Sequence, residues 1–391
     1  MSQVLFASQL YSPIKTIQDA AVSIHNGVIA YAGERSGVPA EKYKEMDFGQ
    51  FRIAPGFVDI HTHGGFGIAF GEGNLRAGLA QYCQNAPASG VTGFLLSLTA
   101  PGAEAMVDLI QKYVPLLENP PKGARPLGFH LEGPYLNPEK KGAFHTSWLR
   151  TPLLADIEMM IQSGAGWVKQ VTLAPELPNA LDAARFLRWQ GVTAALGHSN
   201  TDYETASQAL SGDFTHVTHT FNAQSAFSHR QPGVIGAVLT SREVTAEIIA
   251  DGHHSHPAAI KLLVNALGKE RVVLITDAIS GAGLPDGKYH LMDQDVTVQA
   301  GKATLNDGTI AGSTAQLNNC VRNMTVFSGI SLRAAVRMAT INPAKAVGLA
   351  TTNGLIEPGR KADLVVLDAN AQIQATYIGG EMVYSANEGI Q

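Results

Sequence analysis

The segment GFVDIHTH, residues 56–63, is the most informative stretch of the chain. It is a short apolar run that ends in His-Thr-His, and the alternation of a β-strand places both imidazoles on the same side. Seven further apolar runs of similar length follow, with enough chain for a helix between most of them. These runs occupy residues 91–98, 126–133, 168–176, 192–199, 214–221, 245–254 and 271–278.

Strands that alternate with helices pair in parallel through right-handed crossovers. Eight such units predict an α/β fold, a (β/α)8 TIM-type barrel over residues 55–354. Helix boundary signals support this prediction: PAAIKLLVNALG (257–268) begins with Pro257 and ends with Gly268. Two helices are expected after the last strand, over 314–328 and 331–347, with Ser331 as the N-cap of the second.

The two ends of the chain differ from the barrel region. Residues 1–54 and 355–391 contain short strand-like runs with turns, and Asn26-Gly27 is a strong hairpin signal. Neither end alone offers a sheet with a sufficient hydrophobic face. We therefore predict one small, discontinuous β-sandwich domain built from both termini. The alternative is two independent flaps on the barrel.

Composition excludes several classes of function. The 391 residues include 28 basic and 33 acidic side chains, for a net charge of −5, so a nucleic-acid partner is not expected. No apolar run approaches the ~18 residues that cross a bilayer, and no signal-peptide pattern opens the chain. Cys83 and Cys320 form neither a disulfide framework nor a metal-spaced pair. A cytoplasmic protein without nucleic-acid or membrane partners is expected.

Polar side chains gather at the carboxyl ends of the predicted strands. They are His61, His63, Glu132, His198, His219, Asp251, His253, His254 and Asp277. In a barrel these ends converge on one face, where the active sites of this fold lie. Imidazole and carboxylate groups are ligands for divalent zinc, iron or manganese, so the pattern predicts a metal site.

Seven motifs then follow in a characteristic order. They are HTHGG (61–65), HLEGPYLNPEKKGAFH (130–145), LGHSN (196–200), THTFNAQSAFSHRQPG (218–233), IADGHHSHP (249–257), ITDAISGAG (275–283) and IAGST (310–314). Together they resemble the N-acetylglucosamine-6-phosphate deacetylases of the amidohydrolase superfamily. The resemblance covers nearly the whole chain, including PGRKADLVVLD (358–368). It implies a metal-dependent hydrolase that converts N-acetylglucosamine 6-phosphate into glucosamine 6-phosphate and acetate.

The resemblance also implies a metal-ligand set. Its principal members are Glu132, His198 and His219, and His61 and His63 match the pair that holds a second ion in binuclear members of the family. One or two divalent ions per subunit are therefore expected, with Glu132 as a bridge. Zinc is the first expectation, and iron, manganese or cobalt are the alternatives.

The implied catalytic acid and base is Asp277, which would accept a proton from the attacking water and deliver it to the departing nitrogen. Water bound to a metal has a pKa of ~7, which supplies a nucleophile at neutral pH. The implied substrate-binding residues are His145, Asn222, Ala223, Arg230, His254, Ile310, Ala311 and Gly312. The equivalent of Arg230 reaches the phosphate of the neighbouring protomer's substrate, so a homodimer is expected.

Two local departures from the family pattern leave assignments open. KGAFH (141–145) inserts Phe144 before His145, so the substrate-binding histidine could be shifted by one position. DGHH offers His253 beside His254, and the two could exchange roles.

Three other functions compete with this interpretation. A deacetylase for the galacto epimer, N-acetylgalactosamine 6-phosphate, differs only in the orientation of one hydroxyl group. A dihydroorotase or allantoinase commonly uses a carbamylated lysine as metal bridge, whereas the fourth strand here ends in LAPE (173–176) without lysine. A non-enzymatic sugar-phosphate sensor has no need of the proton shuttle that Asp277 provides.

Overall fold

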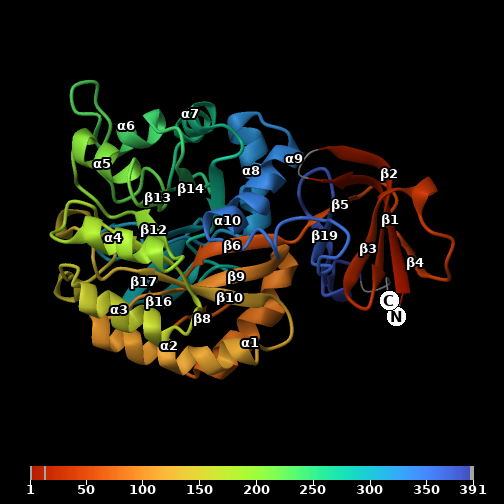
Figure 1. Ribbon diagram of the computed structural model, residues 1–391, viewed down its shortest axis with the longest axis horizontal. Coiled ribbons are helices and arrows are strands. Elements are labelled where there is room, and N and C mark those ends of the chain that lie inside the picture. Colours follow the sequence, from red (N-terminus) through yellow and green to blue (C-terminus); the bar gives the residue numbers. More distant parts are fainter. Residues whose placement is uncertain (1, 13–14, 388–391) are drawn as a thin grey trace.

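The computed structural model describes residues 2–12 and 15–387, and its larger unit is a barrel of parallel strands surrounded by helices (Figure 1). The strand order in the sheet follows the order along the chain. The strands are β6 (Phe57–Thr62), β9 (Val91–Leu98), β10 (Arg125–Glu132), β11 (Val168–Leu173), β12 (Thr193–Leu196), β13 (Phe214–Val217), β14 (Thr245–Ile249) and β15 (Val272–Ile275).

The barrel closes just beyond the ends of its first and last strands. Thr62 forms a parallel bridge with Ala278. The main-chain amide of His63 donates to the carbonyl oxygen of Ala278 at 2.8 Å, and the amide of Asp277 donates to the carbonyl oxygen of His61 at 2.8 Å. The predicted (β/α)8 fold is therefore confirmed.

Each barrel strand leads into a helix on the outside of the barrel. These helices are α1 (Leu75–Asn85), α2 (Ala103–Glu118), α3 (Leu154–Ser163), α4 (Ala180–Trp189), α5 (Tyr203–Leu210), α6 (Gly233–Thr240), α7 (Pro257–Leu267) and α8 (Leu317–Ser328). Short 3-10 turns occur at η1 (Arg35–Gly37), η2 (Ala86–Ser89), η3 (Pro138–Lys140) and η4 (Thr146–Trp148). None of the helices in the described part of the chain combines the length and the apolar character needed to cross a membrane.

The helix predicted over 331–347 is in fact two helices, α9 (Leu332–Met338) and α10 (Ile341–Ala346). Ser331 caps α9 as predicted, because its hydroxyl accepts from the amide of Ala334 at 3.3 Å. The break falls before Pro343, whose ring is tolerated in the first turn of a new helix but not in the interior of a longer one.

The interior of the barrel changes character along its axis. Near α10 it is filled by a small apolar cluster that includes Val58, Ile60, Leu95 and Ile275. Towards the carboxyl ends of the strands the buried side chains are polar, and they include Asp59, His130 and Glu247. Buried polar groups need partners, so the chemistry of the molecule is expected at this polar end.

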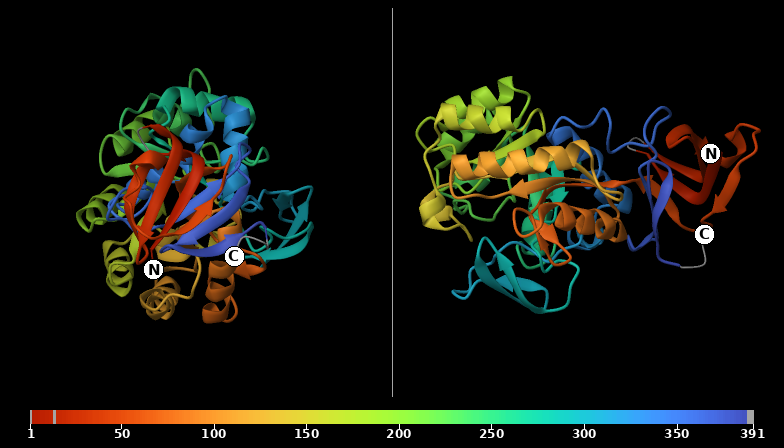
Figure 2. Two further views of the ribbon diagram at one scale, coloured as in Figure 1. Left: turned by 90° about the vertical axis from the view of Figure 1, so that its right-hand side faces the viewer. Right: turned by 90° about the horizontal axis from the view of Figure 1, so that it is seen from below.

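The smaller unit is one sheet made from both ends of the chain, shown in red and blue in Figure 2. Its strands are β1 (Ser2–Tyr11), β2 (Thr16–His25), β3 (Val28–Glu34), β4 (Lys44–Asp47), β5 (Arg52–Pro55), β19 (Leu364–Leu367), β20 (Ile373–Ile378) and β21 (Glu381–Ser385). The β2–β3 hairpin turns at Asn26-Gly27 as predicted, and both residues have positive φ.

The two ends meet where β5 pairs with β19 in antiparallel register, with Ile53 opposite Val366. Both ends also supply one apolar core, in which Leu5 and Ile24 pack with Val366 and Tyr377. A single small β-sandwich domain is therefore confirmed, and the alternative of two flaps is excluded. We propose the predicted boundaries, 1–54 with 355–391 for this domain and 55–354 for the barrel.

An additional three-stranded antiparallel sheet lies between β15 and α8. It consists of β16 (Gly287–Leu291), β17 (Gln294–Gln299) and β18 (Lys302–Thr304), and it projects from the side of the barrel (Figure 2). This sheet was not predicted from the sequence. A two-stranded ribbon, β7 (Gly64–Gly65) with β8 (Ile68–Ala69), follows the first barrel strand.

Candidate metal and active site

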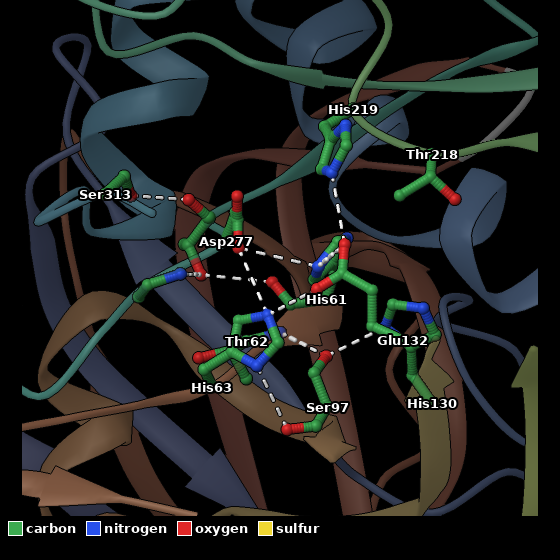
Figure 3. Close-up of polar contacts among 12 residues, drawn as sticks. His61, Thr62, His63, Ser97, His130, Glu132, Thr218, His219, Asp277 and Ser313 are labelled. Atoms are coloured by element: carbon green, nitrogen blue, oxygen red, sulfur yellow. Dashed lines mark hydrogen bonds and ion pairs between the residues drawn. The ribbon is translucent and has the colours of Figure 1, made fainter. Parts of the chain in front are cut away.

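Five predicted metal ligands converge at the carboxyl ends of the barrel strands. They form two groups of three that share Glu132: site A consists of His61, His63 and Glu132, and site B of Glu132, His198 and His219. In each group the ligand atoms lie within 4.8 Å of one another. Figure 3 shows that His61, His63, His219 and Glu132 point toward a common centre, next to Asp277.

The two carboxylate oxygens of Glu132 face rings of both sites. Its Oε2 lies 3.0 Å from Nε2 of His63, in site A. Its Oε1 lies 3.2 Å from Nε2 of His198 and 3.1 Å from Nε2 of His219, in site B. Nε2 of His61 is 3.5 Å from the same Oε1. One carboxylate thus faces both groups, which is the geometry expected of a bridging ligand.

In three of these histidines, the ring nitrogen that faces away from the ligand groups, Nδ1, lies next to a hydrogen-bond acceptor. Nδ1 of His63 lies 3.2 Å from the carbonyl oxygen of Ser97, and Nδ1 of His198 lies 2.7 Å from that of Lys140. Nδ1 of His61 lies 2.9 Å from Oε2 of Glu247. An acceptor at Nδ1 places the proton there, so the lone pair of Nε2 faces the site, as metal ligation requires.

The polar atoms at the centre are poorly satisfied by one another. Nε2 of His61 is buried and forms no hydrogen bond with any described residue. Nε2 of His198 and Nε2 of His219 lie only 3.1 Å apart, although His198 presents a lone pair there. A buried group left without a partner is costly. A divalent cation would satisfy these nitrogens and Glu132 together, and a His-and-carboxylate donor set suits zinc. The residues therefore fit a metal ion.

Asp277 lies beside site A. Its Oδ1 is 3.4 Å from Nε2 of His63 and 3.5 Å from Nε2 of His61. Burial raises the pKa of Asp277, but its interactions with the rings of His61 and His63 outweigh burial and hold that pKa below its usual range. This environment favours the carboxylate form, which can accept a proton.

Several of these residues occupy an unusual backbone conformation. His198, His219 and Asp277 have φ of 48°, 23° and 49°, and Ala223 has φ of 50°. Such left-handed residues without a glycine cost ~1–3 kcal/mol each and cluster at functional sites. His198, His219 and Asp277 each lie two residues beyond the end of a barrel strand, and both histidines contact Glu132.

A cavity of about 270 Å³ opens above the two sites. It is lined by His63, Glu132, His198, His219 and Asp277, and by five of the predicted substrate residues, Asn222, Ala223, His254, Ile310 and Gly312. Gly312 has φ of 54°, and a Cβ there would lie 2.5 Å from the side chain of Ile279. Glycine therefore allows this segment to pass close to the end of β15.

His254, rather than His253, reaches the cavity. Its Nδ1 lies 2.7 Å from Oδ2 of Asp251, whose other oxygen accepts from the amides of both histidines at 2.9 Å. This leaves Nε2 of His254 as the ring nitrogen available to a ligand. His253 is exposed and lies against Gly301 instead.

Three predicted substrate residues do not line this cavity. Ala311 is fully buried behind it. Nε2 of His145 bonds to the carbonyl oxygen of Met292 at 3.1 Å, while Phe144 lines the cavity and packs edge-on against His198. Arg230 is exposed and lines a separate hollow beside α5 and α6.

Several residues of the site were not predicted from the sequence. Lys140, Glu139, Leu291, Met292 and Thr309 line the cavity, the last three from the additional sheet and its flank. Glu247, in the middle of β14, contacts His61 from behind. A charged residue in the apolar run TAEII was a signal for a buried partner, but the partner comes from a strand far away in the sequence.

Comparisons with known proteins agree with this geometry. The amidohydrolase family model matches residues 52–383. The N-acetylglucosamine-6-phosphate deacetylase of Bacillus subtilis is 34% identical, and the match covers 96% of this chain and 98% of that protein. The N-acetylgalactosamine-6-phosphate deacetylase of Escherichia coli O157:H7 is 32% identical, and the match covers 98% of this chain and 99% of that protein.

A solved structure is also closely similar. It is a mutant of the N-acetyl-D-glucosamine-6-phosphate deacetylase of Mycobacterium smegmatis, in complex with N-acetyl-D-glucosamine-6-phosphate. It has a TM-score of 0.91 at 33% identity, and the match covers 98% of this chain and all of that one. The resemblance found in the motifs is confirmed, and the chain belongs to the amidohydrolase family.

Proposed function

We propose that the protein hydrolyses the N-acetyl group of N-acetylglucosamine 6-phosphate to give glucosamine 6-phosphate and acetate. The observation that carries the proposal is the Asp277 carboxylate, held beside two metal-ligand groups at the floor of a cavity. The similar enzymes from Bacillus subtilis and Mycobacterium smegmatis, which carry this activity in their names, support the substrate.

Each residue has a defined part in the proposed reaction. Glu132, His198 and His219 would hold one divalent ion, and His61 and His63 a second that shares Glu132. A bound ion supplies Lewis-acid chemistry, which activates water and polarises the amide carbonyl. Asp277 takes the proton from the attacking water and returns it to the amide nitrogen as the C–N bond breaks. We propose zinc as the ion and the cytoplasm as the location, in keeping with two buried, unpaired cysteines.

The substrate would be bound mainly from the upper part of the cavity. Asn222, Ala223 and His254 offer amide and imidazole groups there, and Ile310 and Gly312 would lie against the sugar ring. Two predicted substrate residues remain. Ala311 would support the cavity wall from behind, and His145 would contact the substrate only if its ring released the carbonyl oxygen of Met292.

Arg230 would bind the phosphate of a neighbouring subunit's substrate. Its place outside the cavity of its own chain supports this role, because a guanidinium binds phosphate through two parallel hydrogen bonds only at close range. A homodimer would then be the functional unit, with each active site completed by the other protomer.

Mixed dimers test this shared site. Arg230→Ala and Asp277→Asn are each expected to be nearly inactive alone on the phosphorylated sugar. Co-expressed chains should recover activity. About half of the dimers in a random mixture are hybrids, and one of the two active sites in each hybrid is intact. The mixture should therefore have about a quarter of the wild-type activity. No recovery in a mixture proven to be hybrid would exclude an Arg230 that acts across the interface.

The galacto epimer remains a second candidate, favoured by the similar enzyme from Escherichia coli O157:H7. Acetate release should be measured on both 6-phosphorylated epimers and on free N-acetylglucosamine. The proposal expects the highest kcat/KM on the phosphorylated gluco substrate. Higher kcat/KM on the galacto substrate would reassign the specificity, and no acetate release from any of them by metal-loaded protein would reject the function.

A further inference from the structure

Glu247 is a fully buried carboxylate in the middle of β14, below the two metal-ligand groups. Four groups donate to it or lie within hydrogen-bond distance. Its Oε2 contacts Nδ1 of His61 (2.9 Å) and the main-chain amide of His219 (3.0 Å), and its Oε1 contacts Nε2 of Gln170 (2.9 Å) and Nε2 of His216 (3.1 Å).

We propose that Glu247 is a positioning residue that holds both the ring of His61 and the main chain of His219, and so links site A to site B. The inference rests on the metal site of the proposed function. It adds to that function a residue that touches neither the ion nor the substrate.

The ring of His61 has an anionic partner at Nδ1. His63 and His198 have main-chain carbonyl oxygens at Nδ1, whereas His61 has a carboxylate. A carboxylate fixes the proton on Nδ1 and makes Nε2 a stronger electron donor than a carbonyl partner does. Nε2 of His61 is buried and forms no hydrogen bond with any described residue. Glu247 therefore prepares this atom for a cation.

Glu247 also holds the backbone of His219. This residue has φ of 23°, outside the regions that L-residues prefer. Its amide donates to the same Oε2 that contacts His61, and the amide of the next residue, Thr220, donates to the carbonyl oxygen of Glu247 at 2.9 Å. One residue thus holds the turn that directs His219 toward Glu132 in site B.

The other oxygen shows that Glu247 itself is held in place. Gln170 and His216 occupy Oε1, and Nδ1 of His216 lies 2.6 Å from the hydroxyl oxygen of Thr245. A carboxylate with four such neighbours cannot rotate to find others, so its geometry is imposed on His61 and His219. An amide at this position would accept at only one end and would carry no charge.

The test compares Glu247→Gln with Gln170→Leu, which removes a neighbour of Oε1 but leaves both contacts of Oε2. Zinc affinity of each purified full-length variant would be measured by competition with a chromophoric chelator. We expect Glu247→Gln to bind zinc ~10–100-fold more weakly. Gln170→Leu should be affected much less, because His216 still holds Oε1 and both contacts of Oε2 remain. Circular dichroism and the thermal midpoint establish that both are folded.

A spectroscopic readout separates positioning from a general loss of structure. In zinc-loaded wild-type protein, the Nδ1 proton of His61 should give a downfield proton resonance that is protected from exchange and correlates with ring nitrogen. That resonance should shift upfield or disappear in Glu247→Gln and persist in Gln170→Leu. If Glu247→Gln does not fold, the wild-type spectrum still decides, because a His61 ring that carries no proton on Nδ1 in zinc-loaded protein would overturn the inference.

The failures are distinguishable. A wild-type protein that binds no zinc, cobalt or manganese would reject the metal site itself. A wild-type protein that binds zinc, with unchanged affinity and resonance in Glu247→Gln, would reject only the role of Glu247.

Discussion

The main-chain amide of Asp277 donates to the carbonyl oxygen of His61 across the seam of the barrel, at 2.8 Å. The same bond therefore closes the sheet and fixes the distance between the proposed proton shuttle and a proposed metal ligand. The carbonyl oxygen of Asp277 in turn accepts from the amide of Ser313 at 2.7 Å. The position of Asp277 is set by its backbone, so changing its side chain should alter the chemistry without moving its neighbours.

Asp277→Asn should lower kcat by ~10²–10⁴-fold, the range for loss of a general acid or base. Asparagine keeps the shape of the side chain but cannot accept the proton. Metal content, measured by elemental analysis, should stay near that of the wild type, because Glu132 and the four histidines remain. Unchanged turnover would remove Asp277 from the mechanism.

His63→Asn and His198→Asn should differ in the ions that they retain. His63→Asn damages site A only, so an ion should still bind between Glu132, His198 and His219. His198→Asn damages site B and should lose at least one ion and most of the activity. Elemental analysis after dialysis, with acetate release in parallel, measures both. Loss of all bound metal from His63→Asn would contradict an independent site B.

Both cysteines should be unreactive in the folded protein. Burial raises the pKa of Cys83 to about 12 and raises that of Cys320 further, and the thiolate is the reactive form. A disulfide reagent such as Ellman's should therefore titrate no thiol at pH 8 in native protein. It should titrate both after unfolding in guanidinium chloride. Rapid labelling of native protein would show that one of these side chains is accessible.

Asp202→Ala should destabilise the protein by ~1 kcal/mol, because Oδ1 of Asp202 caps α5 by accepting from the amide of Thr205 at 2.8 Å. Asp202→Asn is the matched control, since an amide oxygen can replace the cap. The hydrogen bonds from Thr205 lower the pKa of Asp202 in the folded state. Its contribution is therefore present above the unfolded pKa of ~4 and is lost as the pH falls through the folded pKa. Urea unfolding between pH 7 and pH 3 measures this difference.

Much of the fold follows from local patterns in the sequence. The alternation of apolar runs with helix-length segments predicted the barrel, and Asn26-Gly27 predicted a hairpin with the observed turn. The sheet over 287–304 was missed, because its strands are short and only a few apolar residues, among them Val296 and Val298, form its buried face. The break before Pro343 was missed because Leu332–Met338 and Ile341–Ala346 carry similar helical patterns.

The site was predictable as far as it depends on strand ends. His61, Glu132 and His219 follow apolar runs, and a barrel must bring such ends together. Glu247 was not identified because its importance arises from His61, 186 positions away in the sequence. Arg230 illustrates another limit: its motif implies a role in binding, but a single chain places it away from the cavity.

The pairing of β5 with β19 has a consequence for how the chain acquires its structure. Ile53 cannot meet Val366 until nearly the whole polypeptide has left the ribosome. During synthesis, the N-terminal strands β1 to β3 must wait with part of their apolar face uncovered while the barrel emerges. Contacts of such long sequence separation form slowly. The small domain is therefore expected to be completed last in biosynthesis, after the barrel that contains the active site.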